Sequence, residues 1–234
     1  ILEPGLDMLY DLVKVPCAGV VPYTHVDIDD EDSLSERLTA GERKEIDIAV
    51  ISLPRISNFT DFSPFSRFAA VSLRYVKNVF ELGSPDMIII PGTKSTISDL
   101  KWMRQNGLEA EILKKASRGT PVFGICGGLQ MLGKTISDPY QTESGGSIAG
   151  MGLLPIDTVF AKEKTRTQTE GTFEGIERMF SGLNGIAYRG YEIHMGQSDT
   201  TAAVVQNSKV AGSDMHGIFD HNGKAETIAR EPCE

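Results

Sequence analysis

Residues 121–133, PVFGICGGLQMLG, place one cysteine and one glutamine among four glycines. The spacing is G-x-C-x-G-x-Q, formed by Gly124, Cys126, Gly128 and Gln130. It has the shape of a nucleophile elbow, in which a tight strand-to-helix turn presents a reactive side chain. At a helix N-terminus the peptide dipoles favour the thiolate, the reactive form of cysteine. The stretch therefore predicts an exposed nucleophilic sulfur, with the Gly127 or Gly128 N–H free to hold an oxyanion.

The alternative is a buried structural cysteine beside a glycine-rich packing contact. Glycines on both sides, a strand before and a helix after favour the nucleophile. A thiol nucleophile also needs a base. Two of the four histidines, His25 and His221, lie in polar segments, and His194 lies inside YEIHMG. His216 follows a short strand-like segment and precedes a glycine, so we select His216 as the base and His194 as the reserve.

The stretch IIIPGTKSTISDL (88–100) resembles a phosphate-binding loop, but only one glycine precedes Lys94, so we reject nucleotide binding there. We interpret it as a sharp turn beside the elbow, where the N–H of Gly92 or Thr93 supplies the second oxyanion donor. The segment after the strand at 45–53 contains Arg55, Ser57 and Asn58. We expect these three at the rim of the site, for glutamine binding, for docking of a partner domain, or as loop structure.

Alternating strands and helices must position these residues. Short β-branched runs predict strands, and capped segments closed by glycine predict helices. The predicted strands are 45–53, 69–76, 86–92 and 121–125, and the predicted helices are 95–107, 108–119 and 128–136. This order indicates an α/β fold with a doubly wound, mostly parallel sheet, whose ligands collect beyond the carboxyl ends of the strands. After residue 145, segments 152–161, 164–176 and 186–197 predict an antiparallel extension at one edge.

Composition excludes several classes of function. The 234 residues carry a net charge of −9 and are 40% hydrophobic, so a full core is available and nucleic acid is an unsuitable partner. No apolar run approaches the ~18 residues that cross a membrane. Three widely spaced cysteines, Cys17, Cys126 and Cys233, argue against a disulfide framework and favour the cytoplasm.

The first forty residues differ in character from the rest. A helix-like segment at 3–15 and a strand-like segment at 18–23 precede the charged run 27–37, which we interpret as a solvated linker. We place a domain boundary near residue 40, with the catalytic domain at 41–234. Because the chain opens with Ile1 and stops at EPCE, we expect it to be part of something longer.

G-x-C-x-G-x-Q with a distant histidine resembles the class I (triad-type) glutamine amidotransferases. Finer strings resemble the amidotransferase domains of the cobyric acid synthase family in the same order: ISLPRISNFTDF, IIIPGTKSTISDL, GICGGLQMLG, MGLLPIDT, YEIHMG and HGIFD. They span residues 50–220. Residues 1–40 resemble the tail of that family's N-terminal ATP-dependent synthetase domain, with a linker.

The resemblance implies that Cys126 forms a glutamyl thioester while His216 activates the thiol and protonates the departing ammonia. Gly92 and Gly127 would form the oxyanion hole, and Gln130 would help to hold glutamine. Ammonia would pass to the synthetase domain, which uses ATP and Mg²⁺ to amidate four peripheral carboxylates of a corrinoid, adenosylcobyrinic acid a,c-diamide. The part in this chain would hold no cofactor or metal of its own.

One position departs from the family pattern. Triad amidotransferases place a glutamate two residues after the histidine, and this chain has Ile218 there. Either a Cys–His dyad operates, or another acid orients the imidazole. Glu192 and Asp214 are candidates for this third member, although alternation with its neighbours also fits Glu192 as a solvent-side strand residue.

Three other functions remain open at this stage. A glutaminase subunit of a lipid II amidating enzyme has a similar elbow, although residues 1–40 would then be unexplained. A catalytically silent amidotransferase fold would only bind a partner or metabolite. A cysteine-dependent hydrolase could use the same elbow, and Gln130 makes that less attractive.

Overall fold

The computed structural model describes residues 3–20, 43–220 and 224–230. The chain divides into two compact units, Ile1–Glu31 and Asp32–Glu234. The predicted linker at 27–37 and the predicted boundary near residue 40 lie outside the described residues, so both stay predictions.

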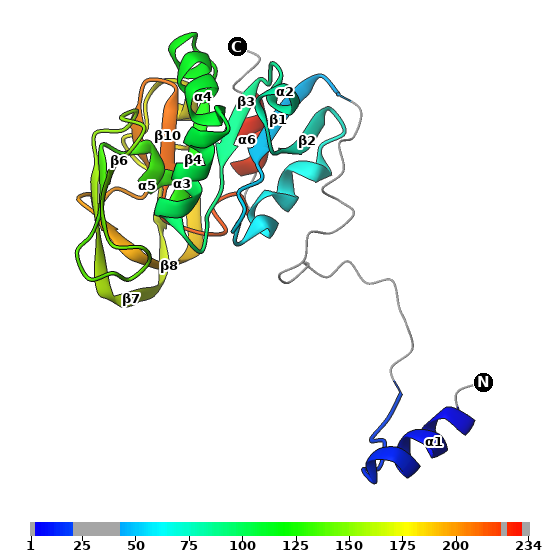
Figure 1. The fold of residues 1–234 in the computed structure, drawn as a ribbon. Helices are drawn as coiled ribbons and strands as arrows, with labels where there is room; N and C mark the ends of the chain where they lie inside the picture. Colours follow the sequence, from blue (N-terminus) through cyan, green and yellow to red (C-terminus); the bar gives the residue numbers. More distant parts are fainter. Residues whose placement is uncertain (1–2, 21–42, 221–223, 231–234) are drawn as a thin grey trace. The chain divides into compact units, whose positions relative to one another are not determined.

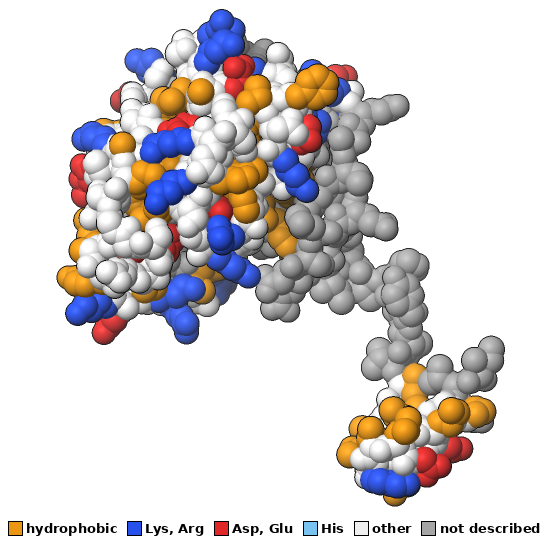
Figure 2. Space-filling view, in the orientation of Figure 1, with side chains coloured by type: hydrophobic (Ala, Val, Ile, Leu, Met, Phe, Trp, Pro, Cys, Tyr) orange, Lys and Arg blue, Asp and Glu red, His pale blue; other side chains and the backbone are white. Residues whose placement is uncertain are grey.

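The first unit contains helix α1, Glu3–Val13, as predicted. The described part of the predicted strand at 18–23 is residues 18–20, which form no strand. Several apolar side chains of α1 are exposed, Leu12 by 81% and Met8 by 66%. Figure 2 shows these hydrophobic side chains on the surface of the helix. Exposed apolar residues grouped on one helix are typical of a surface that another segment covers.

The second unit is built on a six-stranded sheet of order β2-β1-β3-β4-β10-β9 (Figure 1). Its strands are β1 (Ile46–Ile51), β2 (Val71–Val76), β3 (Met87–Ile90), β4 (Val122–Ile125), β9 (Val205–Asn207) and β10 (Val210–Ser213). All neighbouring pairs are parallel except β9 with β10. The predicted α/β class with a mostly parallel sheet is confirmed.

Alternation along the strands gives the sheet two apolar faces. Ile48 and Val50 belong to one core, while Ala49 and Ile51 belong to the other. The second core is covered by α3 (Thr96–Gln105), α4 (Leu108–Ser117) and α5 (Gly127–Leu132). The first core is covered by the 3-10 helices η2 (Phe59–Arg67) and η3 (Arg178–Leu183) and by α6 (Lys224–Arg230). The short α2 (Val79–Leu82) connects β2 to β3.

The predicted extension is a separate mixed sheet of order β6-β5-β7-β8, in which β5 pairs parallel with β7 and the other two pairs are antiparallel. Its strands are β5 (Thr135–Asp138), β6 (Gly146–Ala149), β7 (Asp157–Thr172) and β8 (Ala187–Ser198). Two predicted boundaries were wrong. The helix at 128–136 ends at Leu132, because the backbone becomes extended at Gly133 (φ −66°, ψ −174°) and continues into β5.

The predicted strands at 152–161 and 164–176 are a single strand, β7, whose register with β8 shifts between Phe160 and Thr165. The bulge bends the β7–β8 hairpin, which forms the curved edge of the molecule in Figure 1. One isolated bridge, between Tyr191 of β8 and His216 after β10, links this sheet to the main sheet. The hairpin is thereby held beside the carboxyl ends of the parallel strands. No described helix has the length and apolar character needed to span a bilayer.

Candidate active site

Cys126 occupies the sharp turn between β4 and α5, at φ 50° and ψ −111°. This left-handed φ is strained for a residue with a side chain. The turn closes because its neighbours lack a Cβ: one added to Gly128 would lie 2.0 Å from the Ile90 carbonyl oxygen. The Cys126 N–H donates to the Ser213 carbonyl at 2.8 Å, which ties the elbow to the end of β10. The predicted elbow geometry is therefore present.

The predicted exposure of the thiol was wrong. Cys126 is only 5% exposed, and burial raises the pKa of its thiol well above the ordinary value. The Asp214 and Asp61 carboxylates raise this pKa further, whereas a hydrogen bond from the Gly127 N–H and the charge of Lys164 lower it. Desolvation outweighs the helix dipole here. The resting sulfur is therefore a protonated thiol that needs a base during attack.

His216 is held by an acid from a distant segment. Its Nδ1 lies 2.7 Å from Oδ2 of Asp61 on η2, and Oδ1 of Asp61 accepts the Gly217 N–H at 3.0 Å. Both side chains are buried. Because a carboxylate only accepts, Nδ1 carries the proton and the Nε2 lone pair is available as a base. Asp61 is the acid that orients this imidazole.

The two sequence-predicted candidates for that role have other hydrogen-bond partners. Glu192 lies 3.5 Å from Nε2 of His194, and Asp214 accepts from Gln130 Nε2 at 3.5 Å. Alternation along β8 explains the error for Glu192, since its neighbour Tyr191 faces His216 and Glu192 must face the opposite way. His194 donates from Nδ1 to the Gly196 carbonyl at 2.6 Å.

Tyr191 and Gly92 enclose the His216 ring. The Tyr191 ring stacks on it with centroids 5.3 Å apart, and the two backbones exchange hydrogen bonds of 3.2 and 2.8 Å. The Tyr191 hydroxyl accepts from Asn58 Nδ2 at 2.5 Å. A Cβ on Gly92 would lie 3.0 Å from Cε1 of His216 and 3.2 Å from the Ser57 hydroxyl. Position 92 therefore accommodates only a glycine without displacing the ring.

A cavity of about 460 Å³ opens onto Cys126. Its wall includes Ser57, Asn58, Thr93, Gln130 and Tyr191, as well as the thiol. Gln130 is 1% exposed, and its side chain lies between the Thr96 hydroxyl at 3.4 Å and Asp214. The structure thus brings the elbow, Gln130 and the predicted rim residues Ser57 and Asn58 to one cavity.

Arg55, the third predicted rim residue, is part of the scaffold. Its guanidinium lies 3.2 Å from Asp99, whose other oxygen accepts the Arg55 N–H and the Thr93 hydroxyl. Asp99 is fully buried. This carboxylate fixes the loop after β1 against the turn after β3, which supports the loop-structure interpretation of Arg55.

Glu143 also lines the cavity and was not singled out from the sequence. Its two oxygens accept the N–H groups of Thr96 and Ile97, at 3.0 and 3.1 Å, at the N-terminus of α3. Burial raises the pKa of Glu143. Lys164, a positively charged residue, also lines the cavity. An acid and an amine facing one cavity with a thiol match the zwitterion of a free amino acid.

Among the described residues, no group of histidine, cysteine, aspartate and glutamate side chains is arranged to hold a metal ion. Two parts of nucleophilic chemistry follow neighbouring strands: a thiol on a strained elbow after β4, and an imidazole held by an acid after β10.

The sequence profile of the CobB/CobQ-like glutamine amidotransferase domain matches residues 47–224. The chain belongs to this family. The match begins within β1 and reaches α6, so it includes Asp61, the elbow and His216.

Full-length relatives in this family carry the name cobyric acid synthase. The chain is 50% identical over 264 residues to the protein of Lachnoclostridium phytofermentans and 52% identical over 250 residues to that of Ruminiclostridium cellulolyticum. These alignments cover 100% and 98% of the chain but 52% and 49% of the relatives. The chain spans about half the length of the curated relatives it matches.

Solved structures share the fold. A structure described as a glutamine amidotransferase has a TM-score of 0.55 at 17% identity, covering 79% of this chain and 97% of its own. PurLQS from Thermotoga maritima has a TM-score of 0.57 at 16% identity, covering 81% and 98%. At these identities, the likeness shows that this chain and the two solved structures share an α/β fold, and nothing more.

Proposed function

We propose that this amidotransferase-family chain is the glutaminase part of a cobyric acid synthase, which hydrolyses glutamine and supplies ammonia to a synthetase domain. The observation that carries the proposal is Cys126 on its elbow beside a cavity, with the His216–Asp61 pair at the end of the neighbouring strand. These are the parts that acyl transfer from an amide requires.

In the first step, Sγ of Cys126 attacks the side-chain amide carbon of glutamine while Nε2 of His216 takes the thiol proton. The Gly92 and Gly127 N–H groups stabilise the oxyanion. The C–N bond then breaks, His216 returns its proton to the leaving nitrogen, and ammonia departs from a γ-glutamyl thioester. Asp61 keeps Nδ1 protonated throughout, and so holds the ring in the productive tautomer.

In the second step, His216 takes a proton from water as the water oxygen attacks the thioester carbon; the C–S bond then breaks, glutamate leaves, and His216 returns the proton to Sγ of Cys126. In our proposal Gln130 and Glu143 hold the substrate, with the Glu143 carboxylate facing its α-ammonium group. Lys164 faces the α-carboxylate. The support is the paired charges on the wall of the Cys126 cavity.

The rest of the activity belongs to the longer protein. We propose that residues 1–40 are the tail of a synthetase domain that uses ATP and Mg²⁺ to amidate four carboxylates of adenosylcobyrinic acid a,c-diamide in the cytoplasm. The relatives' length and the exposed apolar side chains of α1, Leu12 at 81%, support this arrangement. The alternative, a free glutaminase subunit of a lipid II amidating enzyme, does not explain the presence of α1.

Covalent labelling tests the proposal. Diazo-oxo-norleucine, a glutamine analogue, should alkylate Cys126, and millimolar glutamine should protect it, as read by peptide mass spectrometry. Cys126→Ala should take up no label, while Cys17→Ala, which removes an exposed cysteine, should label like the wild type. Absence of labelling together with absence of ammonia release would overturn the proposal in favour of a silent binding module.

A further inference from the structure

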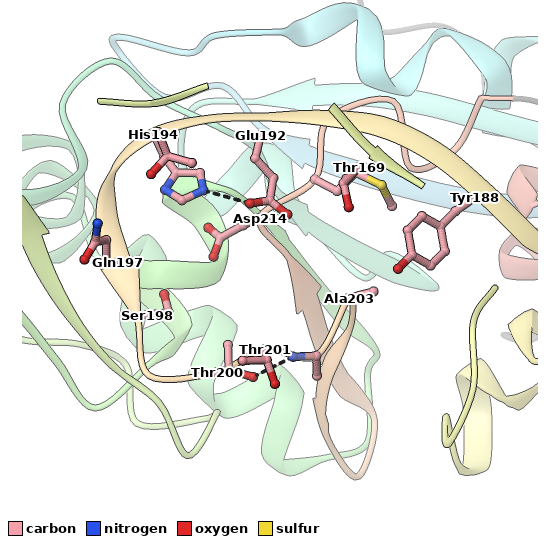
Figure 3. Close-up of a pocket in the computed structure, with 13 residues that line it drawn as sticks. Thr169, Tyr188, Glu192, His194, Gln197, Ser198, Thr200, Thr201, Ala203 and Asp214 are labelled. Carbon is pink, nitrogen blue, oxygen red and sulfur yellow. Dashed lines mark hydrogen bonds and ion pairs between the residues drawn. The ribbon is translucent and has the colours of Figure 1, made fainter. Parts of the chain in front are cut away.

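A second cavity, of about 350 Å³, lies next to the Cys126 cavity and has no role in the chemistry above. Figure 3 shows its wall: Glu192, His194 and Asp214 gather at one end, Tyr188 lies beyond them, and Thr200 and Thr201 lie opposite. Lining residues come from both strands of the β7–β8 hairpin, from the loop after β8 and from the segment after β10.

Strand β8 separates the two cavities. Side chains alternate between the faces of a strand, and Tyr191, Ile193 and Met195 line the Cys126 cavity, whereas Glu192 lines the second one. His194 lines both. The pairing of β7 with β8 agrees with this division. Thr165 of β7 lies directly opposite His194 and also lines the second cavity.

Side chains separate the two cavities at two neighbouring places. One is the His194 ring itself. The other is the contact between Gln130, on the Cys126 side, and Asp214, on the far side, at 3.5 Å. At Gly196 the strand has no side chain, and a Cβ there would lie 2.8 Å from the Gln130 amide. The wall next to Cys126 therefore consists of the His194, Gln130 and Asp214 side chains, with Phe160 and Gln130 packed against Gly196.

The second cavity suits a small hydrogen-bond donor. Its described lining contains two carboxylates and four threonine hydroxyls, and neither lysine nor arginine. His194 donates from Nδ1 to the Gly196 carbonyl, and its Nε2 lies 3.5 Å from Oε2 of Glu192. Ammonia, with three N–H groups, fits such a set of acceptors.

We propose that the second cavity receives the ammonia released at Cys126, which crosses the Gln130–His194–Asp214 wall on its way to the acceptor. No bond forms or breaks in this passage. The inference rests on the proposed glutaminase function and adds the direction in which its product leaves. It makes the β7–β8 hairpin the side of the domain that faces the site of amidation.

Filling the cavity tests this direction. Thr169→Trp places an indole in it from β7, and Glu170→Trp places one on the other face of the same strand as a matched control. Both are measured in a protein that joins this chain to the synthetase half of a cobyric acid synthase relative. The readouts are glutamate formed from glutamine, amide formed from glutamine, and amide formed from added ammonium chloride.

We expect Thr169→Trp to keep glutamate formation within two-fold of wild type and to lower the amide formed per glutamate at least five-fold. Glu170→Trp should keep the wild-type ratio, and ammonium-driven amidation should continue in both. If Thr169→Trp does not fold, Ala203→Phe fills the cavity from the opposite wall and is judged in the same way.

An unchanged ratio in the filled variant overturns the route. Loss of glutamine hydrolysis in that variant also overturns it, because the cavity would then belong to the glutamine site. Failure of the proposed function gives a different result: the wild-type protein would form no glutamate and would amidate only with added ammonium.

Discussion

Nδ1 of His216 lies 2.7 Å from Oδ2 of Asp61, although 155 positions separate the two residues in the chain. The same carboxylate accepts the Gly217 N–H at 3.0 Å, so it fixes both the ring and the backbone beside it. In the proposed mechanism, Asp61 takes the place of the glutamate that triad amidotransferases carry two residues after the histidine, where this chain has Ile218.

Asp61→Asn should lower the rate constant for alkylation of Cys126 by diazo-oxo-norleucine by about 10²- to 10⁴-fold. An asparagine amide can donate to Nδ1, which moves the ring proton to Nε2 and removes the base. Glu163→Gln, which neutralises an exposed acid on β7, should react at the wild-type rate. A wild-type rate in the Asp61 variant, with its thermal unfolding midpoint retained, would contradict the orienting role.

Cys126→Gly should be more stable than Cys126→Ala. Both variants lack the buried sulfur, but only glycine adopts φ 50° without steric cost. The strain relieved, 1–3 kcal/mol, exceeds the entropic cost of glycine, which leaves a difference of about 1 kcal/mol in the free energy of unfolding. Urea unfolding of the two variants measures it, and equal stabilities would mean that the elbow is not strained.

Gly92→Ala should lower the labelling rate of Cys126 about 10- to 100-fold with little loss of stability. The added methyl group would lie 3.0 Å from Cε1 of His216, so the ring must shift, and small displacements of catalytic groups are costly. Gly19→Ala adds the same methyl group where nothing lies within 4 Å and should have no effect. A wild-type rate for Gly92→Ala would show that the ring tolerates the contact.

Asp214→Asn should change how stability depends on pH. Burial, with the Glu192 carboxylate, raises the pKa of Asp214 to about 6, while His194 and His216 act in the opposite direction. Between pH 4 and 6 the folded state keeps a proton that the unfolded state releases, so this group's contribution to stability falls as pH rises.

Asparagine does not ionise, so the variant does not lose stability through this group as pH rises. Its free energy of unfolding relative to wild type should rise by about 2 kcal/mol from pH 4 to pH 7. Denaturant unfolding at both pH values provides the measurement. A difference that stays constant across this range would mean that Asp214 titrates in the fold as it does in the unfolded chain.

Local patterns in the sequence were sufficient for the main sheet and the elbow. The runs around Ile48, Ile89 and Phe123 are apolar on both faces, as strands buried between two helical layers must be. Gly124 and Gly128 reveal the elbow because no other residue fits there: a Cβ on either would lie within 2.6 Å of the backbone. The class of fold and the position of Cys126 on its elbow follow from these short-range constraints.

Asp61 and the burial of Cys126 depend on contacts that no short stretch encodes. Asp61 lies on a 3-10 helix interrupted by Pro64, which has no helical periodicity to mark a buried acid. Glu143 lies in a loop whose conformation depends on Asp138, which accepts the N–H groups of Thr142 and Glu143. The cavity exists only once the β7–β8 hairpin folds over the strand ends, so the high pKa of the thiol was not predictable.

The backbone pairing of Tyr191 with His216 couples the imidazole to the hairpin mechanically. A displacement of β8 must either move the His216 ring with it or break the two backbone hydrogen bonds between Tyr191 and His216. Docking of another protein surface against the hairpin would therefore shift the His216 ring without any ligand entering the Cys126 cavity. The position of the imidazole therefore depends on the position of β8, through these two backbone hydrogen bonds.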